Sequence, residues 1–424
     1  MPVLEAESHG PCSWCCKQIR RARHRFAQQR ADEAQVALRS RMQQIQPPKL
    51  FVLIAPRNVG EFLSFEETPL GEGGFGTVFR GRPTPAGCKL VPELRPSKSY
   101  AVKMVKKTEK GGLTEEIGYS LLSVSPERHL DFMNAMTGRG PFENGIIGFI
   151  AAFIQPQFAM YQVMELLEGP DLFDFLANRS ARLEEVTARG LVRQMVKALH
   201  YMHRTIGALH RDIKPENFGF IKPPTAGQPL PALKLFDMGL AWVLKAPVTE
   251  ETAKKMLHVK RCGTACYMAP EVWDGHTGPP SDVWSLGVVS FITVSLEVPF
   301  KLMEHKQPKL AVRDNELSFE SRAWADASDQ SKQFLQGLLD KVPSSRLTTG
   351  EALAHCWLTA SLEPIAEGAS PDNGVLPPLT ERRLPARSRR SEAGLFESMA
   401  MAPEMSYNGP AAGRRSMLAG EVAT

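Results

Sequence analysis

The pattern of apolar and polar positions divides the chain into three regions. In the middle of the chain, short apolar runs predict strands, with Tyr100–Val102 and Tyr161–Met164 as clear examples. Before them, apolar residues recur at imperfect helical spacing between Ile19 and Ile45. From about residue 363 onward no periodicity is present, and Pro, Ser, Gly, Arg and Ala predominate. We therefore expect residues 363–424 to form a disordered tail.

Residues 1–49 form a separate block with a basic character. Two consecutive prolines end the predicted helix before residue 49. Eight Lys or Arg side chains and only two acids lie between residues 17 and 41. We interpret this segment as a solvated basic helix. Such a helix is also typical of segments that bind calmodulin or a membrane surface, so residues 17–45 carry that second hypothesis.

Composition narrows the class of protein. The chain has 424 residues, of which 43% are hydrophobic and 23% charged, and no run of 18 apolar residues occurs, which indicates a globular protein without a membrane-spanning helix. The acidic start lacks the apolar core of a secretory signal. Seven cysteines in so long a chain make no disulfide framework, and we interpret Cys12, Cys15 and Cys16 as ordinary thiols. We expect a cytoplasmic protein, and the modest net charge of +5 gives no reason to expect a nucleic-acid partner.

The most informative string is His-Arg-Asp-Ile-Lys-Pro-Glu-Asn at residues 210–217. It places Asp212, Lys214 and Asn217 at fixed offsets, and a second acid, Asp237, follows at short range in Asp-Met-Gly. Transfer of a phosphoryl group from ATP needs one carboxylate to orient a hydroxyl group and further oxygen ligands to hold the metal of the triphosphate.

With these motifs, the chain resembles eukaryotic-type serine/threonine protein kinases from about Phe65 to Leu358, most of all the calcium/calmodulin-dependent group. The resemblance implies an α+β fold of two lobes: a small antiparallel β lobe with one helix, residues 65–166, and a larger, mainly helical lobe, residues 167–358. It also implies ATP and Mg²⁺ as cofactors and proteins with Ser or Thr acceptors as substrates. We expect a monomer. No EF-hand pattern follows the kinase-like region, so any calcium response would need a partner.

The resemblance assigns an ATP site to the smaller lobe. Glycines let a hairpin turn tightly and let backbone N–H groups approach phosphate. A lysine at the end of the strand 100–103 would reach the α and β phosphates, and hinge residues would surround the adenine and ribose. The residues implied are Leu70, Gly71, Gly73, Gly74, Gly76, Val78, Ala101, Lys103, Met164, Glu165, Leu167 and Asp171.

The glutamate that should pair with Lys103 departs from the family pattern. Glu116 is our first candidate, because an isoleucine and further apolar residues follow it as in that helix of the family. The spacing from Lys103 is short, however, and Glu115 and Glu127 remain alternatives. Two insertions are also predicted: an exposed one between Arg82 and Ser99, and a Pro-rich one over residues 223–231.

In the larger lobe, the resemblance implies a role for each motif residue. Asp212 would orient the substrate hydroxyl, Lys214 would neutralise charge on the transferred phosphate, and Asn217 with Asp237 would hold Mg²⁺. Met238 replaces the usual phenylalanine, and because methionine fills a similar apolar space we expect no loss of activity. Asp171 and Glu216 would face a basic residue upstream of the acceptor, while Ile292 replaces a further acid used by strongly basophilic members.

The activation segment carries structural predictions. Thr264 would contact Asp212 and Lys214, Glu271 would form a buried ion pair with Arg346, and Asp282 would brace the catalytic loop. The usual phosphorylation position is occupied by Lys260, so we expect activity without phosphate there. We expect the gap to be filled by Thr249, Glu250, Glu251 or Thr252 folding back, or by other contacts that order the segment.

Two other functions are alternatives to that of a catalytic protein kinase. A non-catalytic pseudokinase scaffold is supported by the uncertain helix glutamate and by Asp-Met-Gly, but the residues whose loss would indicate it are all present: Lys103, Asp212, Asn217 and Asp237. Phosphorylation of a small molecule is disfavoured by the full activation segment, which in the family holds a peptide.

Overall fold

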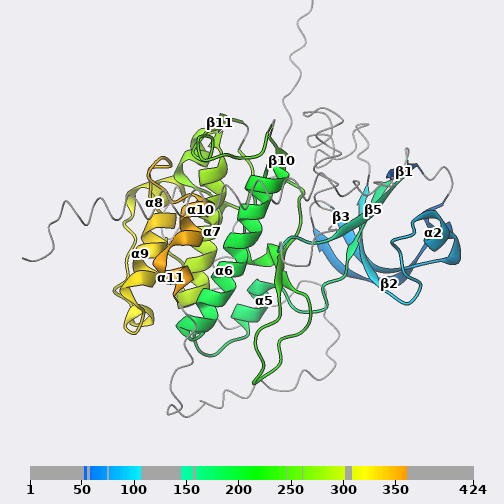
Figure 1. Ribbon diagram of the computed structural model, residues 1–424, viewed down its shortest axis with the longest axis horizontal. Helices are drawn as coiled ribbons and strands as arrows, with labels where there is room; N and C mark the ends of the chain where they lie inside the picture. The colour runs from blue at the N-terminus through cyan, green and yellow to red at the C-terminus, as the bar shows by residue number, and fades with distance from the viewer. Residues whose placement is uncertain are drawn as a thin grey trace, which may run out of the picture. The chain divides into compact units, whose positions relative to one another are not determined.

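The computed structural model describes residues 52–54, 58–73, 76–106, 145–155, 159–244, 246–259, 261–300 and 308–360 (Figure 1). These residues all belong to the compact unit that runs from Leu50. The predicted basic helix, the predicted tail, Gly74, Lys260 and the three candidate glutamates therefore lie outside the described residues.

A six-stranded sheet forms the smaller lobe. Its spatial order is β1-β5-β6-β4-β3-β2, and all neighbours are antiparallel except β1 and β5, which are parallel. Alternate residues of β4 face two different clusters: Tyr100 and Val102 pack into the small-lobe core, whereas Val105 packs into the larger core. The strands are β1 (Val52–Ile54), β2 (Leu63–Gly73), β3 (Gly76–Pro83), β4 (Tyr100–Lys106), β5 (Phe149–Gln155) and β6 (Ala159–Glu165).

The insertion between Arg82 and Ser99, predicted to be exposed, is exposed only in part. This segment forms helix α2 (Pro85–Leu90), capped by Thr84, and its following residues Val91 and Leu94 are almost fully buried in the small-lobe core. Thr84 also donates its hydroxyl to the carbonyl of Glu61, in the short helix η1 (Val59–Glu61), at 2.6 Å. The prolines were interpreted as a sign of a loop, but the apolar residues between them cover one face of the sheet. The residues of the predicted Pro-rich insertion over 223–231, by contrast, are mostly exposed.

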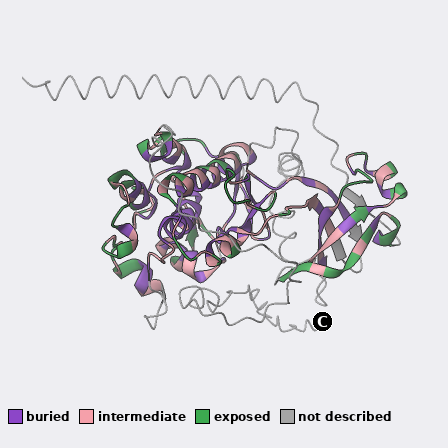
Figure 2. Ribbon diagram, turned by 90° about the horizontal axis from the view of Figure 1, so that it is seen from below, coloured by how far each residue is buried: buried purple, intermediate pink, exposed green. Residues whose placement is uncertain are grey.

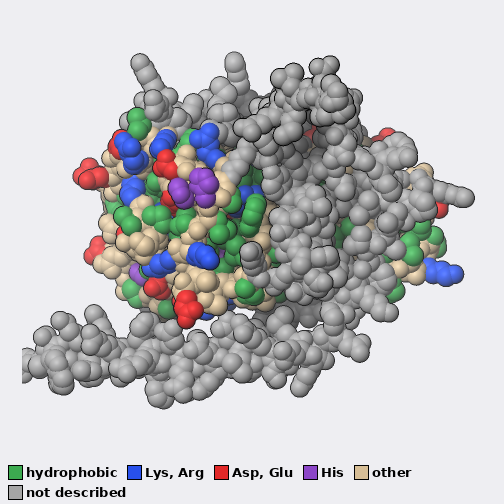
Figure 3. Space-filling view, turned by 90° about the horizontal axis from the view of Figure 1, so that it is seen from above, with side chains coloured by type: hydrophobic (Ala, Val, Ile, Leu, Met, Phe, Trp, Pro, Cys, Tyr) green, Lys and Arg blue, Asp and Glu red, His purple; other side chains and the backbone are tan. Residues whose placement is uncertain are grey.

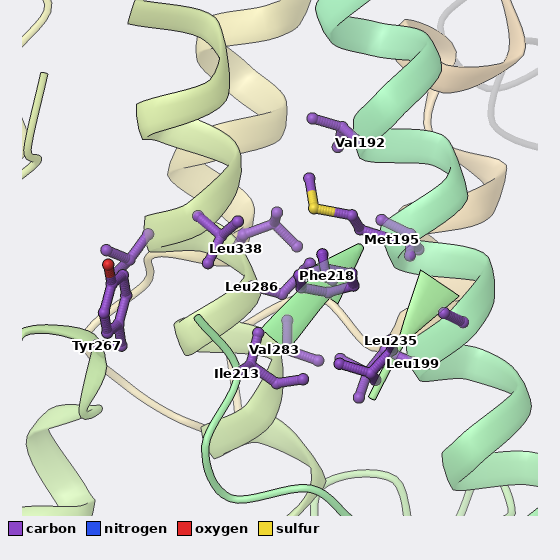
Figure 4. Packing of buried hydrophobic residues seen from close by; sticks show 14 of the residues in the cluster. Val192, Met195, Leu199, Ile213, Phe218, Leu235, Tyr267, Val283, Leu286 and Leu338 are labelled. Carbon is purple, nitrogen blue, oxygen red and sulfur yellow. The ribbon is translucent and has the colours of Figure 1, made fainter. Parts of the chain in front are cut away.

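Helices make up most of the larger lobe, and α6 and α7 lie at its centre (Figure 1). Helix α6 buries an apolar stripe at helical spacing, which includes Leu191, Met195 and Leu199. Helix α7 is buried on nearly all sides and packs against α6 (Figures 2 and 4). The helices of this lobe are α5 (Leu172–Ala177), α6 (Glu185–Tyr201), η3 (Met202–Ile206), η4 (Pro215–Asn217), η5 (Ala265–Tyr267), η6 (Pro270–Asp274), α7 (Pro279–Ser295), α8 (Pro308–Asp314), η8 (Arg322–Trp324), α9 (Asp329–Leu338), α10 (Thr349–Ala354) and α11 (Cys356–Thr359).

Three short antiparallel strand pairs connect these helices and position the loops of the site. They are β7 (Ala208–Leu209) with β10 (Trp242–Val243), β8 (Phe218–Phe220) with β9 (Leu233–Leu235), and β11 (Leu257–His258) with β12 (His276–Thr277). The predicted α+β architecture of a small β lobe and a larger helical lobe is confirmed. Within the described ranges, no helix has the length and apolar character needed to cross a membrane.

Candidate active site

The loop after β7 holds Asp212 in a fixed orientation. One carboxylate oxygen of Asp212 accepts hydrogen bonds from the backbone N–H and the hydroxyl of Thr264, at 2.9 and 2.8 Å. The other oxygen lies 3.1 Å from the ammonium group of Lys214, which also donates to the Thr264 hydroxyl at 3.2 Å. The predicted contacts of Thr264 are therefore confirmed. Asp212 is only 8% exposed, so its carboxylate contacts the protein much more than it contacts solvent.

Asp282 of α7 braces the backbone of this loop, as predicted. Its carboxylate accepts the backbone N–H groups of His210 and Arg211, both at 2.8 Å, and the ring of His203 at 2.8 Å. Arg211 has a left-handed φ of 66°, which a non-glycine residue adopts rarely. Although burial raises the pKa of Asp282, the hydrogen bond and charge of His203 outweigh it and lower that pKa, so the brace stays ionised.

Asn217 and Asp237 provide oxygen atoms beside Asp212. The Asn217 amide donates to the Asp212 carbonyl at 2.7 Å, so its acceptor oxygen is the atom it offers to a cation. Asp237 lies 2.9 Å from the ammonium group of Lys103, which is only 7% exposed on β4. Burial raises the pKa of Asp237, but the charge of Lys103 and its hydrogen bond lower it overall. One amide oxygen and one ionised carboxylate are the hard donors that Mg²⁺ prefers, so these residues fit the predicted metal.

The predicted glycine-rich loop is the hairpin between β2 and β3. In this hairpin Gly73 pairs with Gly76, and Gly71 pairs with Val78. Gly76 has a φ of +137°, and a Cβ atom there would lie 2.3 Å from the carbonyl oxygen of Met104, so the close approach of β3 to β4 requires glycine. Leu70 next to this hairpin is 41% exposed, although its side chain is large and apolar.

The predicted hinge lies at the end of β6. Ala101 on β4 pairs with Met164, and Leu167 packs against the larger core as the chain enters that lobe. Asp171 caps the first turn of α5 by accepting the backbone N–H of Asp174 at 2.7 Å. Burial is the main reason that the pKa of Asp171 rises to about 7, and the charges of Asp174 and Glu216 act in the same direction.

One contact at the hinge was not predicted from sequence. The Glu165 carboxylate forms an ion pair with Lys234 of β9 and accepts the backbone N–H of Gly148. Lys234 is 3% exposed, and β9 is otherwise apolar, so a lysine in the run Leu-Lys-Leu was the available signal that a buried acid lies nearby. The pair joins the last strand of the small lobe to the large lobe, because Glu165 ends β6 and Lys234 belongs to β9.

The end of the activation segment is anchored by a buried ion pair. Arg346 donates to both carboxylate oxygens of Glu271, at 2.7 and 3.1 Å, and also to the backbone carbonyls of Pro280 and Asp340. The prediction of this pair is confirmed. Met238 is partly buried and packs against the larger core, in agreement with its predicted space-filling role.

Aromatic rings and a backbone carbonyl contact two arginines at the activation segment. Arg211 donates to the carbonyl of Leu240 at 2.6 Å and lies over the ring of Trp242, 5.2 Å from its centre. Arg261 lies over Trp273 at 5.1 Å. The sequence had suggested that Glu250 folds back toward this region, but Glu250 pairs with Arg204 at 2.8 Å instead.

The threonines suggested for the same role contact each other. The side chains of Thr249 and Thr252 close a local turn, with their hydroxyl oxygens 3.1 Å apart, because each caps a backbone N–H group of the other. We find no contact of either threonine with Arg211 among the described interactions.

Comparisons with known proteins agree with this geometry. The family described as "Protein kinase domain" matches residues 65–358. A CDPK-related protein kinase of Daucus carota is 33% identical over 234 residues, which cover 55% of this chain and 36% of the relative. Calcium-dependent protein kinase 26 of Arabidopsis thaliana is 30% identical over 315 residues, covering 74% of this chain and 56% of the relative. The chain thus spans about a third to just over half the length of these relatives.

Proposed function

Since the chain belongs to the protein kinase family, we propose that it transfers the γ-phosphoryl group of ATP to serine or threonine hydroxyls of protein substrates. The observation that carries this proposal is the group formed by Asp212, Lys214 and Thr264 beside the Lys103–Asp237 pair. The two relatives compared above are named as protein kinases, which supports the same reaction.

In this mechanism Asp212 accepts a hydrogen bond from the substrate hydroxyl and orients its oxygen. Thr264 and Lys214 hold the carboxylate so that its orientation is set before the substrate arrives. Lys214 also places positive charge where negative charge grows in the transition state. Asn217 and Asp237 would hold the metal and Lys103 the phosphates, and bound Mg-ATP would supply the phosphoryl group together with the charge that stabilises its transfer.

The substitution Asp212→Asn tests the proposal. The amide keeps the size of the side chain and its contact with the Thr264 N–H, but it cannot accept the substrate proton, so we expect transfer to fall by at least about a hundredfold. ATP binding should remain. The measurement is phosphorylation of a degenerate Ser/Thr peptide library with Mg-ATP, together with ATP binding by calorimetry. A variant as active as the parent chain would contradict the assignment of Asp212.

The names of two relatives state calcium dependence, and the sequence offers a basic amphipathic segment over residues 17–45. We propose that calcium acts on this chain through calmodulin bound to that segment, in a cytoplasmic protein. A titration of the full chain with calmodulin, with and without calcium, tests this. Binding that is absent with calcium, or equal without it, would contradict the proposal.

A further inference from the structure

Two histidines on the surface of the larger lobe form a group that the proposed reaction does not use. His258 and His276 stand directly opposite each other in the antiparallel pair β11–β12. Both side chains are exposed, and their ring centres are 5.1 Å apart with the ring planes at 63°. Figure 3 shows histidine side chains gathered together on this face, with basic and acidic side chains around them.

The backbone keeps the two rings together. The N–H of Val259 donates to the carbonyl of Gly275 at 2.9 Å, directly beside both histidines. Gly275 has a left-handed φ of +79°, and a Cβ atom there would lie 3.4 Å from Cε1 of His258. The ring of His258 therefore lies against the turn that leads into His276.

The spacing of the rings is that of an edge-to-face contact, and it also leaves room for two imidazoles to share one metal ion. An imidazole nitrogen binds Zn²⁺ at about 2.0–2.1 Å, and with the ring centre about 1.1–1.2 Å behind the nitrogen, two rings at a tetrahedral angle have centres about 5.2 Å apart. The observed separation is 5.1 Å. We propose that His258 and His276 bind a divalent transition-metal ion of the class that prefers imidazole, such as Zn²⁺, with water completing its coordination.

The surroundings define what kind of site this is. Among the residues that the structure describes, no group of three or more His, Cys, Asp or Glu side chains is arranged to hold a metal, so the protein supplies two ligands. The nearby Asp274 carboxylate is held by Lys309 in an ion pair. Two neutral ligands on an exposed surface give an exchangeable ion, unlike the four protein ligands of a structural zinc site.

An ion at this position would connect the activation segment to the chain that follows it. His258 lies five residues before Gly263, whose own left-handed backbone passes close to the carbonyl of Arg211, and six before Thr264, which holds Asp212. His276 lies beyond Glu271. Occupancy would therefore stiffen the stretch that leads to the catalytic carboxylate. The metal site rests on the geometry of β11 and β12, so it stands or falls independently of the proposed phosphoryl transfer.

The test is a calorimetric titration of the full chain with zinc chloride in buffer that contains Mg²⁺. Cys12, Cys15, Cys16 and the exposed Cys356, whose sulfur lies 3.8 Å from Nδ1 of His355, are first changed to serine, because those thiols also attract zinc. We expect one site, and we expect His258→Gln and His276→Gln each to weaken it by at least about tenfold, since a chelate is lost. His355→Gln is the matched control and should leave binding unchanged. Calcium should not compete, because it prefers oxygen ligands.

A second measurement needs no histidine variant. The electron paramagnetic resonance spectrum of Cu²⁺ added to the same serine-substituted chain should show two equivalent imidazole nitrogens. One nitrogen or none would overturn the proposal, as would zinc binding that survives in both glutamine variants. Loss of zinc binding in His355→Gln would also overturn it. The unfolding temperatures of His258→Gln and His276→Gln without zinc should equal that of the serine-substituted chain, which would show that the loss of binding is local.

Discussion

At the scale of single residues, Asp171 combines a structural role with an unusual acidity. It caps α5, is partly buried, and has a pKa raised to about 7. An acid whose pKa is raised on folding is ionised only above that value, so Asp171 is largely neutral at pH 6 and largely charged at pH 8. If Asp171 faces an arginine upstream of the acceptor, the charged form attracts that arginine and the neutral form does not.

This argument predicts a pH-dependent substrate preference. The ratio of kcat/KM for a peptide with arginine three residues before the acceptor to that for its alanine counterpart should rise several-fold between pH 6 and pH 8. Because both peptides use the same catalytic groups, titration of those groups cancels in the ratio. Asp171→Asn is the control, since asparagine still caps a helix but carries no charge, and its ratio should be flat. A ratio that does not change with pH in the parent chain would show that Asp171 does not interact with the arginine three residues before the acceptor.

At the scale of elements, the activation segment is held by contacts between cations and aromatic rings. Arg211 lies over Trp242 of β10, while the backbone of β10 pairs with β7. A phosphate is therefore not the only means of satisfying Arg211, since the ring and the Leu240 carbonyl already do so. Lys260, the residue at the usual phosphorylation position, lies outside the described residues.

We predict that treatment with a phosphatase leaves peptide phosphorylation unchanged. Trp242→Leu should lower kcat/KM by about two- to thirtyfold, which corresponds to the roughly 0.5–2 kcal/mol of a cation–π contact. Trp242→Phe keeps an aromatic face and should lose less. The rates of all three chains before and after phosphatase are the measurement. Loss of activity on dephosphorylation of the parent chain would show that a phosphate orders the segment after all.

At the scale of the whole molecule, the continuous motifs and the long-range contacts that the family resemblance implies could be predicted, and contacts outside that pattern could not. The loop 210–217 has its functional groups at fixed offsets along one stretch of chain, so the sequence was enough to place Asp212, Lys214 and Asn217 together. The ion pair of Glu165 with Lys234 joins residues far apart in sequence, and only a lysine inside an apolar strand hinted at it.

The errors have physical reasons as well. The Pro residues between Arg82 and Ser99 favoured an exposed segment. Val91 and Leu94 nevertheless pack into the small-lobe core, because tertiary packing outweighs local propensity there. Glu250 was one of several residues suggested to fill the gap left by Lys260, yet it pairs with Arg204 of η3. The glutamate partner of Lys103 remains a prediction, because Glu115, Glu116 and Glu127 lie outside the described residues.

The ion pair between Glu271 and Arg346 leads to a prediction about the stability of the larger lobe. Arg346 is 1% exposed and also lies over the ring of Trp284. Removal of its partner in Glu271→Ala leaves a buried positive charge, which should lower the free energy of unfolding by roughly 3–5 kcal/mol. The exposed pair of Arg313 with Asp314 is the contrast, and Asp314→Ala should lower the free energy of unfolding far less.

Chemical denaturation of the parent chain and the variants measures both effects. The double variant Glu271→Ala/Arg346→Met should recover part of the loss, because methionine fills much of the space of the arginine stem without burying a charge. Recovery would show that the uncompensated charge, and not the missing carboxylate alone, destabilises Glu271→Ala. If Glu271→Ala and Asp314→Ala lower the free energy of unfolding equally, the Glu271–Arg346 pair contributes no more than a surface ion pair. The activation segment must then be anchored to the helical lobe by apolar contacts, such as those of Tyr267 and Met268 in the larger core.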